Sequence, residues 1–166
     1  MDDPGKTDIL DLFKEQEPVD LDIEKVLPAN TSTFISLGMS NKEQYKKQLL
    51  ELYRQNGKLN DYMQWKENIQ SDYGFDPEKT FYDLLHREVG VAFLSANAEH
   101  PRKNAFIVIK TKGKREAQAT LSQVSKQATE RSGNSPFQTS LKIDKETHYP
   151  IYKLPVEDLF SRLFGS

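Results

Sequence analysis

The fold class of this chain depends on two apolar runs, residues 89–96 (VGVAFLSA) and residues 104–111 (NAFIVIKT). Continuous apolar runs of this kind are typical of buried strands. A polar connector with Asn97, His100 and Pro101 separates the runs, as in an antiparallel hairpin with a longer loop. We therefore predict that the two runs are the central strands of a sheet.

Three helices are predicted between this hairpin and an earlier strand at residues 33–37 (TFISL). Apolar residues recur at helical spacing in each helix, and residues that start or end helices lie between them. Those boundary residues are Ser40 with Glu43 as a capping box, Gly57, Gly74, and Asp76 followed by Pro77. The apolar stripe of the second helix consists of Leu59, Tyr62, Met63, Ile69 and Tyr73. The third helix should bury Phe81, Leu84 and Leu85.

A fourth helix and a second hairpin are predicted after the central strands. The helix has a narrow stripe of small apolar residues, so it can lie close against a sheet. That stripe consists of Ala117, Leu121, Val124 and Ala128. The hairpin combines residues 137–143, in which apolar residues alternate, with the extended residues 149–154. Pro150 cannot donate to a ladder, so its strand should lie at an edge or a bulge.

The order of these elements predicts an α+β domain. Strand, helices, strand, strand, helix, strand is the split βαβ (ferredoxin-like) order with extra helices in the first crossover. We expect one antiparallel sheet with helices on one face. Right-handed crossovers would place the first strand and residues 104–111 in its middle. The predicted core residues are Phe34, Leu37, Leu49, Leu52, Val91, Phe93, Ile107, Ile109, Leu121, Val124 and Leu141.

Charge is distributed unevenly along the chain. The net charge is −2, yet residues 1–30 carry nine acids against three lysines. We therefore predict that residues 1–26 are an acidic, mobile leader with few core contacts. Residues 27–166 would form a single domain, which we expect to be part of a longer chain. The positive surplus of this domain is scattered, which argues against nucleic-acid binding.

Several function classes are excluded by composition. The apolar runs are far shorter than the roughly 18 residues of a membrane-spanning helix, so we expect no transmembrane segment in this sequence. The absence of cysteine excludes disulfides, cysteine nucleophiles and thiolate metal sites. The amino terminus has no basic or apolar signal region, although a signal peptide is removed from mature proteins.

Residue types that act as catalytic groups or metal ligands in other proteins form no known catalytic or metal motif in this sequence. No G-x-S-x-G elbow occurs, and pairs of acids such as Glu157 and Asp158 are typical of solvated faces. Residues 112–115 (KGKR) open a helix but lack the glycines of phosphate-binding loops, so we interpret them as a basic turn. The histidines match no local zinc spacing. They are His86, which should follow a helix, and His100 and His148, which should lie in loops. We therefore predict no catalytic residue, cofactor or metal.

The carboxyl end has an apolar surface that must be covered. Pro155 starts a short helix whose apolar residues are Val156, Leu159, Phe160, Leu163 and Phe164. Burying such side chains is worth about 1.5–3 kcal/mol each. The helix either closes over its own domain or packs against residues beyond Ser166 and contacts another molecule. We favour the second alternative, which predicts a homo-oligomer through this helix. Trp65 lies off the stripe of the second helix, should be partly exposed, and completes the candidate interaction surface.

Four segments carry a resemblance to a known family. They are residues 27–31 (LPANT), 74–92 (GFDPEK through EVGVA), 107–121 and 149–154 (YPIYKL). Together they resemble an uncharacterised family of bacterial cell-envelope proteins that contain a domain of unknown function. The chain departs from the family at His86 and Arg87, where a small glycine-containing turn is more common. The resemblance implies an exported or membrane-anchored protein of the envelope or periplasm, without established activity.

Two hypotheses about function follow. The first is a non-enzymatic cell-envelope module that binds a protein partner, or another part of its own full-length chain. The alternative is a small-molecule or glycan-binding domain, or a hydrolytic one, with a pocket of dispersed acids and aromatics. A deep pocket that joins Trp65 or a tyrosine to two close carboxylates would favour the alternative.

Overall fold

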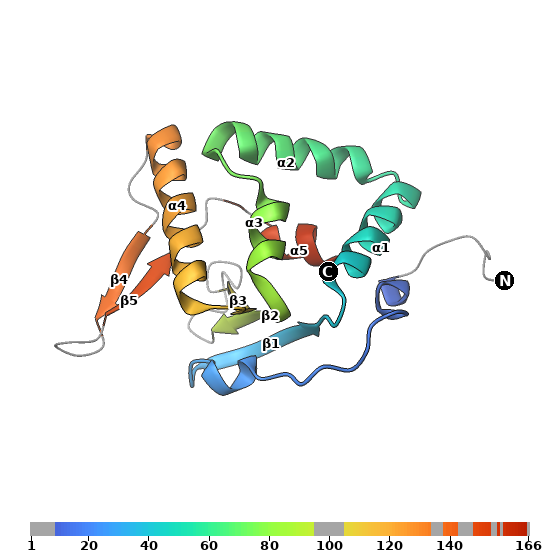
Figure 1. Ribbon diagram of the computed structural model, residues 1–166, viewed down its shortest axis with the longest axis horizontal. Helices are drawn as coiled ribbons and strands as arrows, with labels where there is room; N and C mark the ends of the chain where they lie inside the picture. The colour runs from blue at the N-terminus through green and yellow to red at the C-terminus, as the bar shows by residue number, and fades with distance from the viewer. Residues whose placement is uncertain are drawn as a thin grey trace.

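A three-stranded antiparallel sheet covered by helices on one face forms the centre of the molecule (Figure 1). The structure is a computed structural model, and it describes residues 9–94, 105–133, 138–142, 148–153, 156 and 158–165. The strands are β1 (Thr31–Gly38), β2 (Leu85–Leu94) and β3 (Ala105–Thr111). The predicted α+β class and the antiparallel pairing of the two apolar runs are confirmed.

The helices are α1 (Lys42–Gln55), α2 (Leu59–Tyr73), α3 (Pro77–Leu84), α4 (Lys114–Ser132) and α5 (Leu159–Phe164), with 3-10 turns η1 (Ile9–Phe13) and η2 (Ile23–Val26). Helices α1 to α4 begin and end close to the predicted residues, whereas α5 begins at Leu159, four residues after its predicted start. Gly57 and Gly74 have positive φ and end α1 and α2, and the Asp76 side chain caps α3. The cap of α1 is Asn41 instead of Ser40, because the Asn41 side chain accepts the amide of Gln44 while Ser40 accepts the amide of Glu17.

The order of the strands differs from the prediction. The sheet order is β1-β2-β3, so β2 lies in the middle, and β4 (Gln138–Lys142) pairs with β5 (His148–Tyr152) in a separate sheet. Helices α1 to α3 return the chain antiparallel to β1, which makes β2 its neighbour. Gly90 permits this close pairing, since an added Cβ would lie 2.4 Å from Cε2 of Phe34 and 2.8 Å from the carbonyl oxygen of Ile35.

The centre of the core lies within the helical layer. Of the predicted core residues, Leu49, Leu52 and Val124 are buried. The sheet residues and Leu121 are only half-buried, and the side chain of Leu141 lies outside the described residues. The reason is that α5 fills the space between α1, α3 and β2, so the largest buried side chains come from helices. Helix α4 lies against α2 and β5 (Figure 1).

Residues 9–26 contribute to the core. Leu12 of η1 is 0% exposed and Ile23 of η2 is 4% exposed. The buried carboxylate of Glu88 accepts the amides of Asp22 and Ile23 as well as the hydroxyl of Ser36. The prediction of few core contacts is therefore wrong for this part of the leader, because Leu12 and Ile23 point inward although Ile9, Leu10, Leu21 and Val26 stay exposed. Asp11 and Asp22 also pair with lysines. The domain boundary at residue 27 and the mobility of the leader stay predictions, and residues 1–8 lie outside the described part.

Three further expectations are corrected. Met63 is 47% exposed, because the buried stripe of α2 follows Tyr62 and Ile69. His86 lies in β2 with an exposed side chain, and His148 begins β5, whereas both were expected outside strands. Both strands start earlier than the sequence predicts. His100 lies outside the described residues. In the described part of the chain, no helix has the length and apolar character needed to cross a membrane.

Candidate functional site: the C-terminal helix and its groove

Helix α5 packs against η1, α1, α2 and α3, and the surface that it covers is the candidate site. We call this the helix groove and define it by its contact residues Leu12, Tyr45, Leu49, Tyr53, Trp65 and Tyr82. Packing is tight around Gly165, where an added Cβ would lie 2.8 Å from Leu49 and 3.4 Å from Leu12. The two ends of the described chain therefore meet in one place.

Three tyrosine hydroxyls bind the carboxyl end of α5. Tyr45 donates to the carbonyl of Phe164 at 2.7 Å, and Tyr82 donates to the carbonyl of Leu163 at 2.7 Å. Tyr53 donates to the carbonyls of Arg162 and Ser161, at 2.9 and 3.1 Å. The last four carbonyls of a helix have no partner within the helix. The tyrosine clamp (Tyr45, Tyr53 and Tyr82) supplies donors to these carbonyls in α5, and the Ser161 carbonyl also accepts the amide of Gly165 at 2.9 Å.

Burial changes the acidity of the clamp. Removal from water raises the pKa of the hydroxyls of Tyr45, Tyr53 and Tyr82 above the ordinary tyrosine value, because the charged phenolate is disfavoured there. The nearby charge of Arg162 opposes this effect at Tyr53. The clamp therefore stays protonated, and able to donate, to a higher pH than free tyrosine.

Trp65 is half-buried and contacts Arg162 of α5. Its ring stacks on Tyr62 with 5.6 Å between the centroids, and the guanidinium carbon of Arg162 lies 5.9 Å from its centroid. A cation over a tryptophan face is an attractive arrangement. Since Trp65 is the single tryptophan of the chain, its fluorescence reports specifically on this site.

A group of charges holds the three helices of the groove together. The carboxylate of Glu78 at the start of α3 accepts the hydroxyl of Tyr62 at 2.7 Å and lies 3.2 Å from the ammonium of Lys66, both on α2. Lys46 of α1 lies 3.8 Å from the same carboxylate. These residues come from α1, α2 and α3, so Glu78 links the three helices that α5 packs against.

The six residues predicted as an interaction surface come together at this site. Leu159, Phe160, Leu163 and Phe164 are 3%, 7%, 0% and 1% exposed, while Val156 and Trp65 are half-buried against the same core. The helix therefore docks on its own domain, which is the alternative that we did not favour. The physical reason is that the chain itself supplies both the apolar groove and the hydroxyl donors. A contact between molecules stays a prediction.

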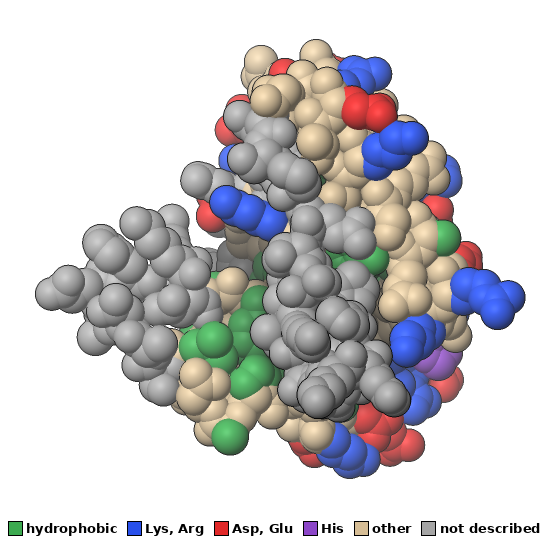
Figure 2. Space-filling model, turned by 90° about the vertical axis from the view of Figure 1, so that its left-hand side faces the viewer, with side chains coloured by type: hydrophobic (Ala, Val, Ile, Leu, Met, Phe, Trp, Pro, Cys, Tyr) green, Lys and Arg blue, Asp and Glu red, His purple; other side chains and the backbone are tan. Residues whose placement is uncertain are grey.

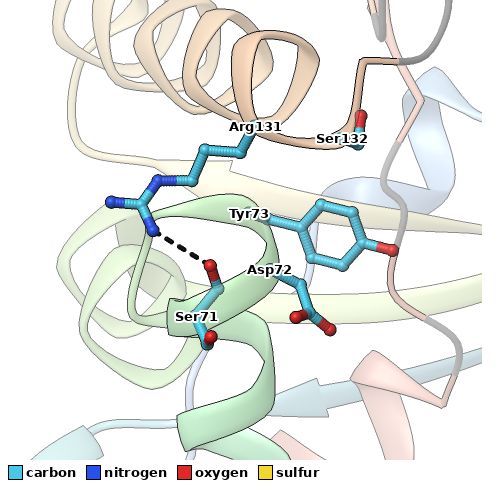
Figure 3. A pocket seen from close by; sticks show the side chains of 5 residues that line it. All are labelled: Ser71, Asp72, Tyr73, Arg131 and Ser132. Carbon is cyan, nitrogen blue, oxygen red and sulfur yellow. Dashed lines mark hydrogen bonds between the residues drawn. The ribbon is translucent and has the colours of Figure 1, made fainter.

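The alternative function requires a pocket, and an open hollow of about 560 Å³ lies between α2 and α4 (Figure 3). It is lined by Ser71, Asp72, Tyr73, Arg131 and Ser132. The guanidinium of Arg131 donates to the carbonyl of Ser71 at 2.9 Å and points away from the carboxylate of Asp72. The hollow joins one tyrosine to one carboxylate, whereas glycoside hydrolysis ordinarily uses a pair of carboxylates.

Charges of both signs are mixed on the surface that carries α4. Figure 2 shows lysine and arginine side chains next to acidic ones along one rim of this face. Within the described ranges, no three histidine or acidic side chains converge as metal ligands do.

Sequence reasoning missed the clamp and the buried acid. Tyr45 and Tyr82 are buried although the predicted core residues did not include them, and the direction of their hydroxyls depends on α5. Glu88 was part of a family-like segment with no assigned role. The available signal was the presence of tyrosines on the predicted helices, because buried tyrosine hydroxyls usually have a partner.

Comparison with known proteins assigns the chain to a family. Residues 8–145 match the family described as "Protein of unknown function (DUF3352)". The chain belongs to this family. No curated protein and no solved structure matches the chain. The DUF3352 match includes the leader from residue 8 and every residue of the helix groove, whereas α5 follows the matched range.

Replacing Tyr82 by phenylalanine should lower the free energy of unfolding by about 1–2 kcal/mol, because the carbonyl of Leu163 loses its buried donor. Urea denaturation measures this change, and amide exchange of α5 should become faster. Tyr152→Phe is the matched control, since that hydroxyl contacts Ser122 and Gln118 of α4. Equal acceleration of α5 exchange in both variants would contradict the clamp.

The clamp also predicts loss of stability at alkaline pH. The folded state raises the pKa of the three hydroxyls above that of the unfolded chain, so stability is complete below about pH 10 and falls as pH rises further. Urea denaturation at a series of pH values from neutral to alkaline measures this slope. The slope should be smaller in Tyr45→Phe, and a slope unchanged by that substitution would refute the assignment.

Proposed function

We propose that this chain is a non-enzymatic cell-envelope module that binds protein by accepting an amphipathic helix in the helix groove. The observation that carries the proposal is the tyrosine clamp, which binds four successive backbone carbonyls at a helix end. In the structure the occupant is α5 of the same chain, which corresponds to binding another part of the chain itself.

The chemistry of the groove suits recognition of a helix. Helix-in-groove binding uses apolar anchors spaced three or four residues apart on one face. In α5 these anchors are Leu159, Phe160, Leu163 and Phe164, and all four are buried. Backbone carbonyls are present in every helix, so the clamp selects for a helix end, while the anchor pockets select for large apolar side chains.

Placement in the cell envelope or periplasm is supported by the sequence resemblance described above. Fractionation of bacteria that express the native gene tests it, with an antibody against residues of the domain as the probe. Recovery in the envelope or periplasmic fraction is expected, and recovery with cytosolic markers would refute this part of the proposal.

The groove is tested with the intact chain and a peptide of residues 156–165 (VEDLFSRLFG). The linked α5 competes at an effective concentration of about millimolar, so the peptide must be titrated to that range. We expect a saturable change in Trp65 fluorescence, because displacing α5 removes Arg162 from the tryptophan face. The matched control is the same peptide with Phe164→Ala, which should bind at least about tenfold more weakly.

Amide exchange provides an independent readout. If another helix can replace α5, then α5 must open while the sheet stays folded. The free energy of opening measured by amide exchange should therefore be lower for α5 than for β2. Equal opening free energies in α5 and β2, together with no peptide-dependent fluorescence change, would show that α5 is inseparable from the core and would refute the groove function.

The second candidate function, glycan or small-molecule binding, has one favourable observation, the hollow with Tyr73, Asp72 and Arg131. NMR titration with neutral and acidic sugars tests it. Chemical-shift changes confined to the carboxyl ends of α2 and α4 would favour this function. The absence of shift changes in these residues would refute it.

A further inference from the structure

The contacts that hold α5 do not depend on which chain supplies it. The clamp binds backbone carbonyls of α5, the apolar anchors enter the core, and Arg162 lies over Trp65. All of these contacts are made by residues 159–165. The α5 of a second copy would therefore make the same contacts in the groove.

The residue before α5, Asp158, has a strained backbone. Among the described residues it is the single non-glycine residue with a positive φ. Asp158 has a φ of 56°, in the left-handed region, and its side chain makes no capping hydrogen bond. Its carbonyl accepts the amide of Arg162 and the hydroxyl of Ser161. Rotation about the N–Cα bond of Asp158 would relax φ and redirect the preceding chain, while its carbonyl kept both bonds.

The element before α5 is anchored separately. Strand β5 pairs only with β4 in its sheet, and the hydroxyl of Tyr152 contacts Ser122 and Gln118 on α4. The hairpin of β4 and β5 lies beside α4, apart from α5 (Figure 1). The hairpin can therefore keep its place on α4 while α5 leaves the groove.

We infer that two copies of this chain exchange α5, so that each groove is filled by the helix of the other copy in a symmetric dimer. The exchange keeps every groove contact and releases the strain at both Asp158 residues, and strained hinges favour such swapping. The single-chain state is favoured at low concentration by the tether. This inference rests on the proposed function, since α5 must leave its groove without loss of the sheet.

The test uses the intact chain and NMR. Equal amounts of isotope-labelled and unlabelled chain are unfolded together, refolded at about millimolar concentration and separated by size. In the dimer fraction, isotope-filtered spectra should show contacts between the rings of Phe164 and Tyr82 on different copies, because these rings lie 5.6 Å apart in a filled groove. Monomer alone, or a dimer in which these contacts stay within one copy, would overturn the inference.

Two variants of the junction sharpen the test. Asp158→Gly removes the strain of the closed chain, so it should lower the association constant of the dimer at least about fivefold. Asp158→Asn removes the charge but keeps a residue that tolerates the same conformation, so it should dimerise like the parent chain. Equal dimerisation of all three would contradict the role of the junction. Peptide binding without any exchanged dimer would leave the groove function intact and refute only the exchange.

Discussion

Replacing Phe164 by alanine should lower the free energy of unfolding by about 3–5 kcal/mol, the usual cost of removing a buried phenylalanine ring. Phe164 is 1% exposed, and its ring lies 5.6 Å from that of Tyr82 and 5.4 Å from that of Phe160. Its carbonyl is held by Tyr45, so the backbone cannot move far to fill the cavity. Chemical denaturation followed by circular dichroism measures the change.

The matched control lies in the same helix. Arg162→Ala removes a half-buried side chain whose main contact is the face of Trp65, so it should cost about 1 kcal/mol or less. A loss below about 1 kcal/mol for Phe164→Ala would contradict the placement of α5 in the core. An equal loss of stability in both variants would indicate that any substitution in α5 destabilises the protein, and that the buried ring of Phe164 has no special role.

The sequence predicted those features that depend on neighbouring residues. Asp76 and Pro77 start α3, and Gly57 and Gly74 end α1 and α2, because capping and left-handed backbone are local properties. Both hairpins were also predicted, since each connects strands that are close in sequence. The order of strands in the sheet was not, because it depends on how three helices pack together before β2 begins.

The candidate site was predicted in part. The apolar residues of α5 and Trp65 were identified, but their partners were not. The hydroxyls of Tyr82 and Tyr45 reach carbonyls 81 and 119 residues further along the chain. No periodicity within α1 or α3 contains that information. The same holds for Leu12, whose burial depends on α1 and α5, and for this reason an acidic segment was interpreted as a leader without core contacts.

Glu88→Ala should lower the free energy of unfolding by about 3 kcal/mol, because three donors lose a buried acceptor. The carboxylate of Glu88 is 0% exposed and accepts the amide of Asp22 at 2.7 Å, the amide of Ile23 at 3.2 Å and the hydroxyl of Ser36 at 3.0 Å. Alanine leaves these donors without a partner beneath η2. Urea denaturation measures the loss, and amide exchange of residues 22 and 23 shows whether the leader detaches.

Two controls separate the role of the carboxylate from that of the side-chain volume. Ser36→Ala removes one donor and should lower the free energy of unfolding by about 1 kcal/mol. The double variant with Glu88→Ala should lose less stability than the sum of the two single losses, because both substitutions remove the same hydrogen bond. Glu67→Ala on the exposed surface of α2 should change stability by less than about 0.5 kcal/mol. If Glu88→Ala left the exchange of the Ile23 amide unchanged, residues 9–26 would be held by their apolar contacts alone, and Glu88 would not be the residue that fixes the leader to the sheet.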